Sequence, residues 1–370
     1  MNLSESLLNY RDLSILVRAD ADALGWLEEF LAPSFSRHSN GQRDHGTVVD
    51  CVVDKKRYQE CQREYRRGTT RTYSCFTMDG RYDSFPGTTA SDHALIFLER
   101  FKIVLRLQYE SVQQRVCHVE ILGRDQTARM RLILMKVVRE LATSYAIKEF
   151  ALPLHGAAFV QSKQGVGLIG RKQAGKTTTL INQLLNHDCE YLSNDRFFIF
   201  RESSQWIIQG MPTIVKIRHP SLDLFPQLKT NYLRHSYHRE RTLKEVHQNS
   251  GIASQTEEAV SLSQAQLFEI TGVQTATSAI LHEIMTPRLN PRVHSSVRNR
   301  LSLSNSMQLL KANVLQPSKT EMIPSVFNPN FDNHAYRKAL HLRLLQLAQE
   351  IPVIELHQNA VTLEQERKAA

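Results

Sequence analysis

Residues 165–181, with the sequence GVGLIGRKQAGKTTTLI, constrain the fold of this chain more than any other stretch. They contain the pattern G-x-x-x-x-G-K-[ST], which is typical of a phosphate-binding loop, at Gly170, Gly175, Lys176 and Thr177. A loop that folds its backbone N–H groups around a β-phosphate needs glycine where a Cβ would clash. The lysine adds a positive charge for the β- and γ-phosphates, and the threonine hydroxyl can bind Mg²⁺. The spacing therefore predicts a nucleotide site.

The residues on either side of this loop support the same interpretation. An apolar run over 166–169 predicts a buried strand that leads into the loop. Apolar side chains at helical spacing over 178–185 predict a helix whose positive end faces the anion. The predicted nucleotide-binding residues are Gly170, Arg171, Lys172, Gln173, Ala174, Gly175, Lys176, Thr177 and Thr178.

A second glycine pattern overlaps the first. Gly165, Gly167 and Gly170 fit G-x-G-x-x-G, the dinucleotide-binding pattern. Its first two glycines fall at or before the predicted strand, whereas that pattern requires them in the turn after a strand. We interpret this match as a coincidence.

The length of 370 residues suits two domains, and the loop lies in the second half of the chain. We expect an N-terminal α+β domain over 1–149 and a nucleotide-binding catalytic domain over 150–370. No apolar run approaches the roughly 18 residues that a membrane span requires, and the acid-rich N-terminus does not resemble a signal or transit peptide. None of the 5 cysteines has C-x-x-C spacing, which predicts reduced thiols. We therefore expect a cytoplasmic protein that does not contact a membrane.

The net charge of +9 indicates acidic partners, and part of the excess is clustered. One run of arginines lies between residues 63 and 71, and another between 234 and 241. Neither is interleaved with aromatic residues in the way that base stacking on nucleic acid requires. A solvated basic face is therefore favoured, although nucleic acid stays open as a partner.

The N-terminal half has the pattern of an α/β domain but no evident catalytic group. His93 and His118 are isolated in the sequence, and we interpret them as packing or surface residues. We expect this half to recognise the acceptor. Its predicted elements are helices over 23–31 and 125–145, strands over 47–53, 71–78 and 115–122, and a longer strand over 95–107 that is bent or broken.

An acidic residue follows the loop at the edge of the next apolar run. In the segment 189–200, CEYLSNDRFFIF, Asp195 lies where a carboxylate that organises Mg²⁺ is needed. A parallel strand beside the loop strand would bring it to the metal and the γ-phosphate. The alternative is that Asp195 is an ordinary turn residue. Asp195 and Thr177 are thus the predicted metal ligands.

Six segments follow one another in a recognisable order: 154–157 (LHGA), the loop, 192–195 (LSND), 210–218 (GMPTIVKIR), 278–288 (SAILHEIMTPR) and 351–356 (IPVIEL). This ordered set resembles the kinase domain of HPr kinase/phosphorylase and its relatives, which share the phosphoenolpyruvate-carboxykinase type of nucleotide-binding fold. The resemblance covers roughly residues 150–355 and implies a P-loop kinase domain that uses ATP and Mg²⁺. It also implies that His155 lies near the phosphates. A catalytic arginine is expected after the 278–286 strand, with Arg288 and Arg292 as candidates and Arg298 behind them.

Two positions depart from the family pattern. Asn194 replaces the first of two aspartates, the one taken as the base for the attacking hydroxyl, and an amide cannot accept that proton. Lys216 replaces a glutamate thought to help with the metal. Because phosphoryl transfer depends mainly on positioning and charge neutralisation, these changes need not abolish it. They argue against the family's protein substrate, so HPr is not expected as a partner.

Residues 231–274 also depart from the family core, being basic and histidine-rich before they become polar. A lid or substrate loop and a disordered segment are the two alternatives for this stretch. No cysteine or carboxylate joins its histidines at ligand spacing, which disfavours a metal site there. A final helix is predicted over 333–350.

Together these features predict a kinase that moves the γ-phosphoryl group of ATP, or of another nucleotide, to a hydroxyl of a small molecule or a peptide serine. An ATP-binding regulator or scaffold with little transfer is the alternative, because of Asn194 and Lys216. A P-loop GTPase or motor is disfavoured, since no N-K-x-D motif is present. Assembly into a homo-oligomer is left open as an alternative to a monomer. The predicted catalytic residues are His155, Lys176, Asp195, Arg288 and Arg292.

Overall fold

The computed structural model divides into two compact units, the first ending at Tyr145 and the second beginning at Ala146, with Phe327 assigned to the first. Within the residues described, none of the helices is both long enough and apolar enough to span a bilayer. The structure describes residues 3–37, 46–68, 70–77, 82–90, 92–110, 115–125, 128–234, 259–290, 292–293, 295–315, 327 and 333–359.

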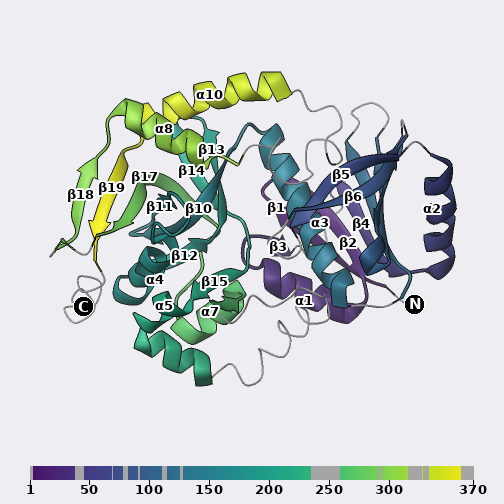
Figure 1. Ribbon diagram of the computed structural model, residues 1–370, viewed down its shortest axis with the longest axis horizontal. Helices are drawn as coiled ribbons and strands as arrows, with labels where there is room; N and C mark the ends of the chain where they lie inside the picture. The colour runs from purple at the N-terminus through teal and green to yellow at the C-terminus, as the bar shows by residue number, and fades with distance from the viewer. Residues whose placement is uncertain are drawn as a thin grey trace. The chain divides into compact units, whose positions relative to one another are not determined.

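The first unit is built on one mixed sheet, in which the described residues form nine strands in the order β3-β1-β2-β4-β9-β8-β7-β6-β5 (Figure 1). The central strands β2, β4 and β9 are parallel, and the pairs on either side are antiparallel. The strands are β1 (Ser4–Tyr10), β2 (Leu13–Ala19), β3 (Ser36–Arg37), β4 (Thr47–Val53), β5 (Thr70–Thr77), β6 (Tyr82–Thr89), β7 (His93–Leu98), β8 (Ile103–Tyr109) and β9 (Val116–Gly123).

The helices of this unit are α1 (Ala21–Leu31), α2 (Lys55–Arg67) and α3 (Ala128–Lys148), with a 3-10 turn at Glu99–Phe101. Asp20 and Asp54 cap α1 and α2, because each carboxylate accepts a bond from a backbone N–H in the first turn. α2 buries only Tyr58 and Cys61, which pack with Phe97 and neighbouring apolar side chains of the sheet. The rest of α2 is polar.

The predictions for this half are confirmed in part. The strand over 47–53 is β4, and the long strand over 95–107 is broken into β7 and β8 by the 3-10 turn, after which Lys102 has a positive φ of 54°. The hairpin of β1 and β2 and the helix α2 were not predicted. α2 was missed because most of its thirteen residues are charged or amide side chains and only two are buried, so its apolar face is too small to stand out in the sequence.

The second unit contains an eight-stranded sheet within the described residues, in the order β11-β10-β13-β14-β17-β19-β18, with β12 paired to β10. Because β11 also pairs with β17, the strands β11, β10, β13, β14 and β17 close on themselves. A separate pair is formed by β15 and β16. The strands are β10 (Leu152–Gln161), β11 (Gln164–Ile169), β12 (Cys189–Ser193), β13 (Arg196–Glu202), β14 (Gln205–Gly210), β15 (Val215–Arg218), β16 (Ala259–Leu262), β17 (Ser278–Leu289), β18 (Val297–Arg300) and β19 (Val353–Gln358).

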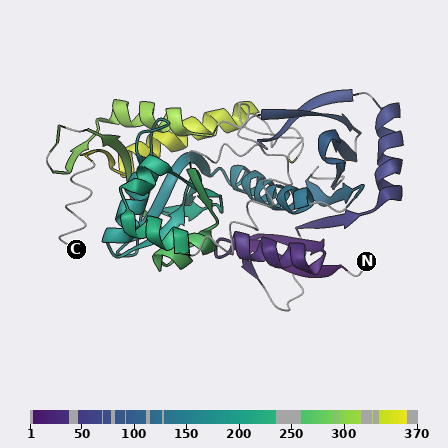
Figure 2. The same ribbon diagram turned by 60° about the horizontal axis from the view of Figure 1, so that its bottom comes forward.

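Two apolar cores lie against this sheet. One joins α4 to the β15–β16 pair, α5 and α7, and the other joins the sheet to α8 and α10. α8 and α10 lie side by side, and α4 lies on the other side of the sheet (Figures 1 and 2). The helices are α4 (Lys176–Asn186), α5 (His219–Asp223), α7 (Gln264–Thr271), α8 (Leu303–Asn313) and α10 (Asn333–Glu350).

The predicted strand before the loop, the helix after it and the helix over 333–350 are confirmed as β11, α4 and α10. Gly165 and Gly167 lie inside β11, and a Cβ on Gly165 would be only 2.3 Å from Ile208 Cγ2. These glycines therefore allow the strands to pack closely. This agrees with the interpretation that the match to the dinucleotide-binding pattern is a coincidence.

The end of the stretch 231–274 forms regular structure in the second unit. β16 pairs with β15, and α7 begins with a capping box formed by Ser263 and Gln266, so the end of this stretch is part of the second unit. The lid, the disordered alternative and the histidines at 235, 238 and 247 fall outside the described residues.

Candidate functional site

The loop between β11 and α4 contains two glycines whose backbone conformation is left-handed or close to it. Gly170 has φ +146° and Gly175 has φ +95°, which L residues rarely adopt. A Cβ on Gly170 would lie 3.0 Å from Thr286 Oγ1, and one on Gly175 would lie 3.1 Å from Leu289 Cγ. Gly175 is also the N-cap of α4 and provides no side-chain cap. The first N–H groups of α4 therefore have neither an intrahelical nor a capping partner, and an anion can take that place.

Lys176 folds back over this loop. Its Nζ donates to the carbonyl oxygens of Gly170 at 2.7 Å and Arg171 at 3.1 Å. Burial lowers the pKa of Lys176, and the negative charge of Asp195 opposes that shift. A phosphate in the loop would offer this ammonium group charged acceptors, which make stronger hydrogen bonds than neutral carbonyls.

The turn between β12 and β13 brings Asn194 and Asp195 to the loop. Thr177 Oγ1 donates to Asn194 Oδ1 at 3.3 Å. Asp195 has a positive φ of 82°, and its side chain is 57% exposed. The residue next to the Thr177 hydroxyl is thus Asn194, whereas Asp195 was the predicted partner at the metal. The Asp195 carboxylate lies 3.5 Å from His155 Nδ1 and acts electrostatically on Lys176.

His155 and Asp195 lie together on the other side of this turn. His155 Nδ1 lies 2.9 Å from the Asp195 backbone oxygen and 3.5 Å from Asp195 Oδ1. The backbone N–H of Gly156 donates to the same Asp195 oxygen at 3.1 Å. A Cβ at Gly156 would be 2.2 Å from the Leu168 carbonyl oxygen, so only glycine allows β10 to approach β11 this closely. The structure therefore brings together His155, Lys176 and Asp195 from the predicted catalytic set.

The strands β11, β17 and β19 are parallel, so their carboxyl ends lie at one edge of the sheet. Ligands of open α/β sheets bind at such edges. A pocket of about 780 Å³ lies there, between the loop, the ends of β17 and β19, and α8. Its lining residues are Arg171, Lys172, Gln173, Ala174, Thr286, Pro287, Arg288, Leu289, Leu301, Asn305, Gln308, Leu309, Ala312, Asn313 and Glu355.

The predicted arginines are placed differently from one another. Arg288 lies within β17, not after the strand as expected, because β17 continues to Leu289, and it forms an ion pair with Glu355 in the pocket. Arg292 is exposed beyond the strand, outside the pocket lining. Arg298 pairs with Glu283 at 2.5 Å. Arg288 is therefore the arginine that the structure brings to the loop.

Two further predicted positions have distinct surroundings. Thr178 is buried, and its hydroxyl lies 3.0 Å from Ser221 Oγ, so only its backbone N–H is available to a phosphate. Lys216 is exposed on β15, which alternates between buried and exposed residues.

Asn313 was not predicted, although it contacts the loop directly. The Gly170 N–H donates to Asn313 Oδ1 at 3.0 Å, and Asn313 Nδ2 donates to the Leu309 carbonyl oxygen at 2.8 Å. The two bonds fix the amide between the last turn of α8 and the base of the loop. No sequence signal marks it, because its partner lies 143 residues away.

Replacing Asn313 by alanine is expected to weaken MgADP binding about 2- to 10-fold. This loss corresponds to the net free energy of one hydrogen bond, here the bond that holds the loop. Calorimetric titration of the folded variant measures this loss. Asn299→Ala, on exposed β18, is the matched control and should bind as the wild type does. Wild-type affinity in Asn313→Ala would show that the bond does not position the loop.

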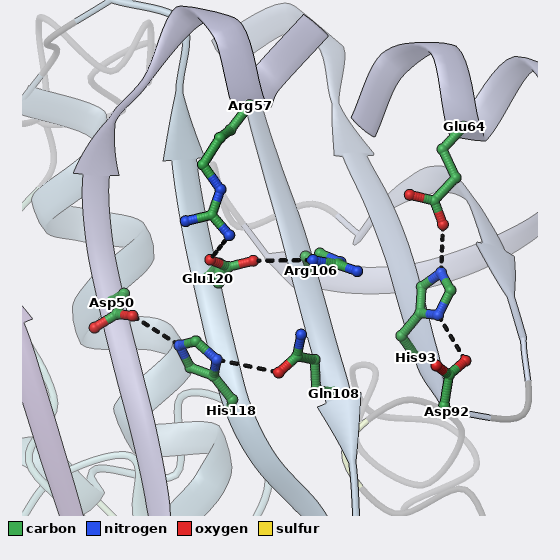
Figure 3. Close-up of polar contacts among 9 residues, drawn as sticks. All are labelled: Asp50, Arg57, Glu64, Asp92, His93, Arg106, Gln108, His118 and Glu120. Atoms are coloured by element: carbon green, nitrogen blue, oxygen red, sulfur yellow. Dashed lines mark hydrogen bonds and ion pairs between the residues drawn. The ribbon is translucent and has the colours of Figure 1, made fainter. Parts of the chain in front are cut away.

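A second polar cluster lies on the sheet of the first unit (Figure 3). Asp50, His118 and Glu120 place their ligand atoms within 4.8 Å of one another, as a metal centre would. Glu120, whose side chain is 2% exposed, already pairs with Arg57 and with Arg106. A divalent cation would have to displace these guanidinium groups, so we interpret the cluster as an ion-pair network.

Each of the two histidines of the first unit has hydrogen-bond partners on both sides of its ring. His118 lies between Asp50 Oδ2, at 2.7 Å, and Gln108 Oε1, at 3.2 Å (Figure 3). His93 lies between Asp92 and Glu64, and its hydrogen bond holds the pKa of Asp92 below the ordinary value. The partners of each histidine come mainly from neighbouring strands and α2, so the sequence could not reveal them.

Comparison with known proteins gives little to rely on. No protein-family model matches the chain, and the search of curated proteins gives no match. Among solved structures, the Hpr(Ser) kinase/phosphatase from Coxiella burnetii shows distant similarity, with 11% sequence identity, a TM-score of 0.26, and coverage of 58% of this chain and 91% of that chain. A score this low decides neither fold nor function.

Proposed function

We propose that this protein is a nucleotide-dependent kinase that transfers the γ-phosphoryl group of ATP to a hydroxyl group. The observation that carries the proposal is the loop: two glycines with positive φ, a lysine folded over it, and the open N-terminus of α4. His155 and Asp195 beside the loop, and Arg288 in the adjoining pocket, support transfer rather than binding alone.

In this proposal each residue has a defined task. The loop backbone and Lys176 hold the β- and γ-phosphates. The terminal nitrogens of Arg288, whose Nε stays paired with Glu355, neutralise charge on the transferring group. The acceptor oxygen bonds to the γ-phosphorus while the bond to the β,γ-bridging oxygen breaks, and ADP leaves with that electron pair. The Asp195 carboxylate takes the hydroxyl proton and passes it to water.

The oxygen atoms near the loop fit Mg²⁺. Thr177 offers a hydroxyl, Asn194 an amide oxygen and Asp195 a carboxylate, which are the hard ligands that this ion prefers beside substrate phosphates. Thr177 and Asn194 would hold it first, since their oxygens already meet at 3.3 Å. The ion would neutralise charge on the β- and γ-phosphates.

The test uses ATP labelled with ¹⁸O in the γ-phosphoryl group. Wild-type protein and Lys176→Ala are incubated with Mg²⁺ and an extract of metabolites and peptides, and products are identified by mass spectrometry. A labelled phosphate on a new species with the wild type alone supports the kinase. Nucleotide binding without any labelled product from the extract contradicts it.

The second candidate function is a nucleotide-binding regulator with little transfer, and the position of Asn194 favours it. The group that meets Thr177 is a neutral amide, where a carboxylate would bind Mg²⁺ more strongly and could accept a proton.

Replacing Asn194 by aspartate separates the two functions. If the protein is a kinase, the new carboxylate beside Thr177 is expected to raise the transfer rate about 10-fold or more. Initial rates with labelled ATP measure this change, and Gln205→Glu, at an exposed position at the start of β14, controls for added charge. An unchanged, negligible rate in Asn194→Asp would favour the regulator.

A further inference from the structure

We propose that the phosphoryl acceptor is a small anionic molecule that binds in the pocket beside the loop, with its negative group against Arg171 and Lys172. This inference rests on the proposed kinase function and concerns the substrate of the same site. It narrows the acceptor from any hydroxyl compound to one class, and it excludes a serine in a folded protein.

The size of the pocket supports a small molecule. Its volume of about 780 Å³ lies within the roughly 300–1,000 Å³ typical of small-molecule sites. It is walled by the loop on one side and by α8 on the other, with the ends of β17 and β19 between them. A hydroxyl compound enclosed there lies beside the loop that would hold the γ-phosphate, which is the placement that in-line transfer needs.

The charge of the lining supports an anion. Among the lining residues that the structure describes, Arg171, Lys172 and Arg288 are cationic and Glu355 is the only acid. Glu355 is already neutralised, because one carboxylate oxygen pairs with Arg288 and the other lies 2.9 Å from His357 Nε2. Arg171 and Lys172 are exposed, so the pocket keeps a positive charge on its loop side.

The phosphates of the nucleotide do not require these two side chains. Backbone N–H groups and Lys176 bind phosphates in a loop of this kind, and Arg288 is available to the transferring group. Arg171 and Lys172 extend from the loop into the pocket lining instead. They are therefore free to bind a negative group on the second substrate.

The wall formed by α8 supports a polar molecule. Asn305 and Gln308, three residues apart on the helix, both line the pocket beside Leu309 and Ala312. Amide groups donate and accept hydrogen bonds, so they suit hydroxyl groups as well as carboxylate or phosphate oxygens. A compound with a carboxylate or phosphate at one end and a hydroxyl group within reach of the loop can bind the cations of the loop and the amides of α8 together.

The experiment separates acceptors by charge before the reaction. A metabolite extract is ultrafiltered to remove protein and passed over an anion exchanger at pH 7, which gives a retained anionic fraction and an unretained neutral and cationic fraction. Each fraction, and the protein fraction, is incubated with full-length wild-type protein, Mg²⁺ and γ-¹⁸O-labelled ATP. We expect the labelled product from the anionic fraction alone.

The other outcomes overturn one proposal or both. Label on a compound from the unretained fraction, or on a polypeptide, overturns the anionic acceptor and leaves the kinase intact. No transfer from any fraction, with MgATP binding intact in calorimetry, overturns the kinase and this inference with it.

A variant of a lining residue then tests whether the acceptor binds in this pocket. With the acceptor identified above, Gln308→Ala is expected to raise the KM for the acceptor at least 5-fold while the KM for ATP changes less than 2-fold, since one hydrogen bond of this kind contributes about 1–1.5 kcal/mol. Lys338→Gln, on the exposed face of α10, is the control. A rise in the KM for ATP instead would place the nucleoside in this pocket and overturn the inference.

Discussion

Alanine in place of Lys176 is expected to weaken MgATP binding about 10- to 100-fold and to lower the transfer rate by a further factor of about 10²–10³. The first effect is the loss of charge-assisted hydrogen bonds to phosphate, each contributing about 1.5–3 kcal/mol. The second is the loss of a fixed positive charge where negative charge develops during transfer. The Lys176 ammonium group donates to the carbonyl oxygens of Gly170 and Arg171, at 2.7 and 3.1 Å, which holds it over the loop.

Calorimetric titration and initial rates separate these two effects. Lys338→Ala is the matched control, because it removes the same charge from an exposed position on α10, and it should behave as the wild type does. Unfolding temperatures of both variants close to that of the wild type establish that the fold is retained. Full transfer by Lys176→Ala would disprove the assignment of the phosphate site.

Asparagine in place of Asp195 is expected to lower the transfer rate about 10²-fold or more and to change nucleotide affinity little. The substitution keeps the shape of the side chain, and asparagine tolerates the positive φ of 82° as well as aspartate does. It removes the carboxylate that would take the proton and that raises the pKa of Lys176 against the effect of burial.

Initial rates at saturating ATP measure this loss. Asp188→Asn, an exposed residue just beyond α4, makes the same chemical change away from the site and should keep the wild-type rate. If Asp195→Asn kept the wild-type rate while binding nucleotide normally, Asp195 would be a turn residue, as the alternative interpretation of the sequence holds.

The sequence was most informative where the physical cause is local. The strand, loop and helix around Lys176 follow from neighbouring residues, since glycine, lysine and apolar spacing act within a few positions. The break after Leu98 and the length of α10 also depend on residues that are close in the sequence. The assignment of β4 succeeded because its β-branched residues alternate between buried and partly exposed positions.

The sequence was least informative where contacts join distant residues. Asn313 meets Gly170 across 143 residues, and His118 meets Asp50 across 68. Glu355 lies in a segment that the family resemblance singled out, yet its pairing with Arg288 in the pocket could not be seen from the sequence. Asn194 rather than Asp195 meets Thr177, and the residue pattern does not distinguish these two neighbours.

The pocket depends on β19, the last strand that the structure describes, because this strand supplies Glu355 and because Gln358 donates to the hydroxyl of Thr179 on α4. The loop leaves the ribosome long before that strand does. During synthesis the chain therefore carries a finished phosphate motif for more than 170 residues before β19 can join β17 beside it. Any ligand bound in that interval would lack the completed pocket, so the order of synthesis places pocket formation after the phosphate motif.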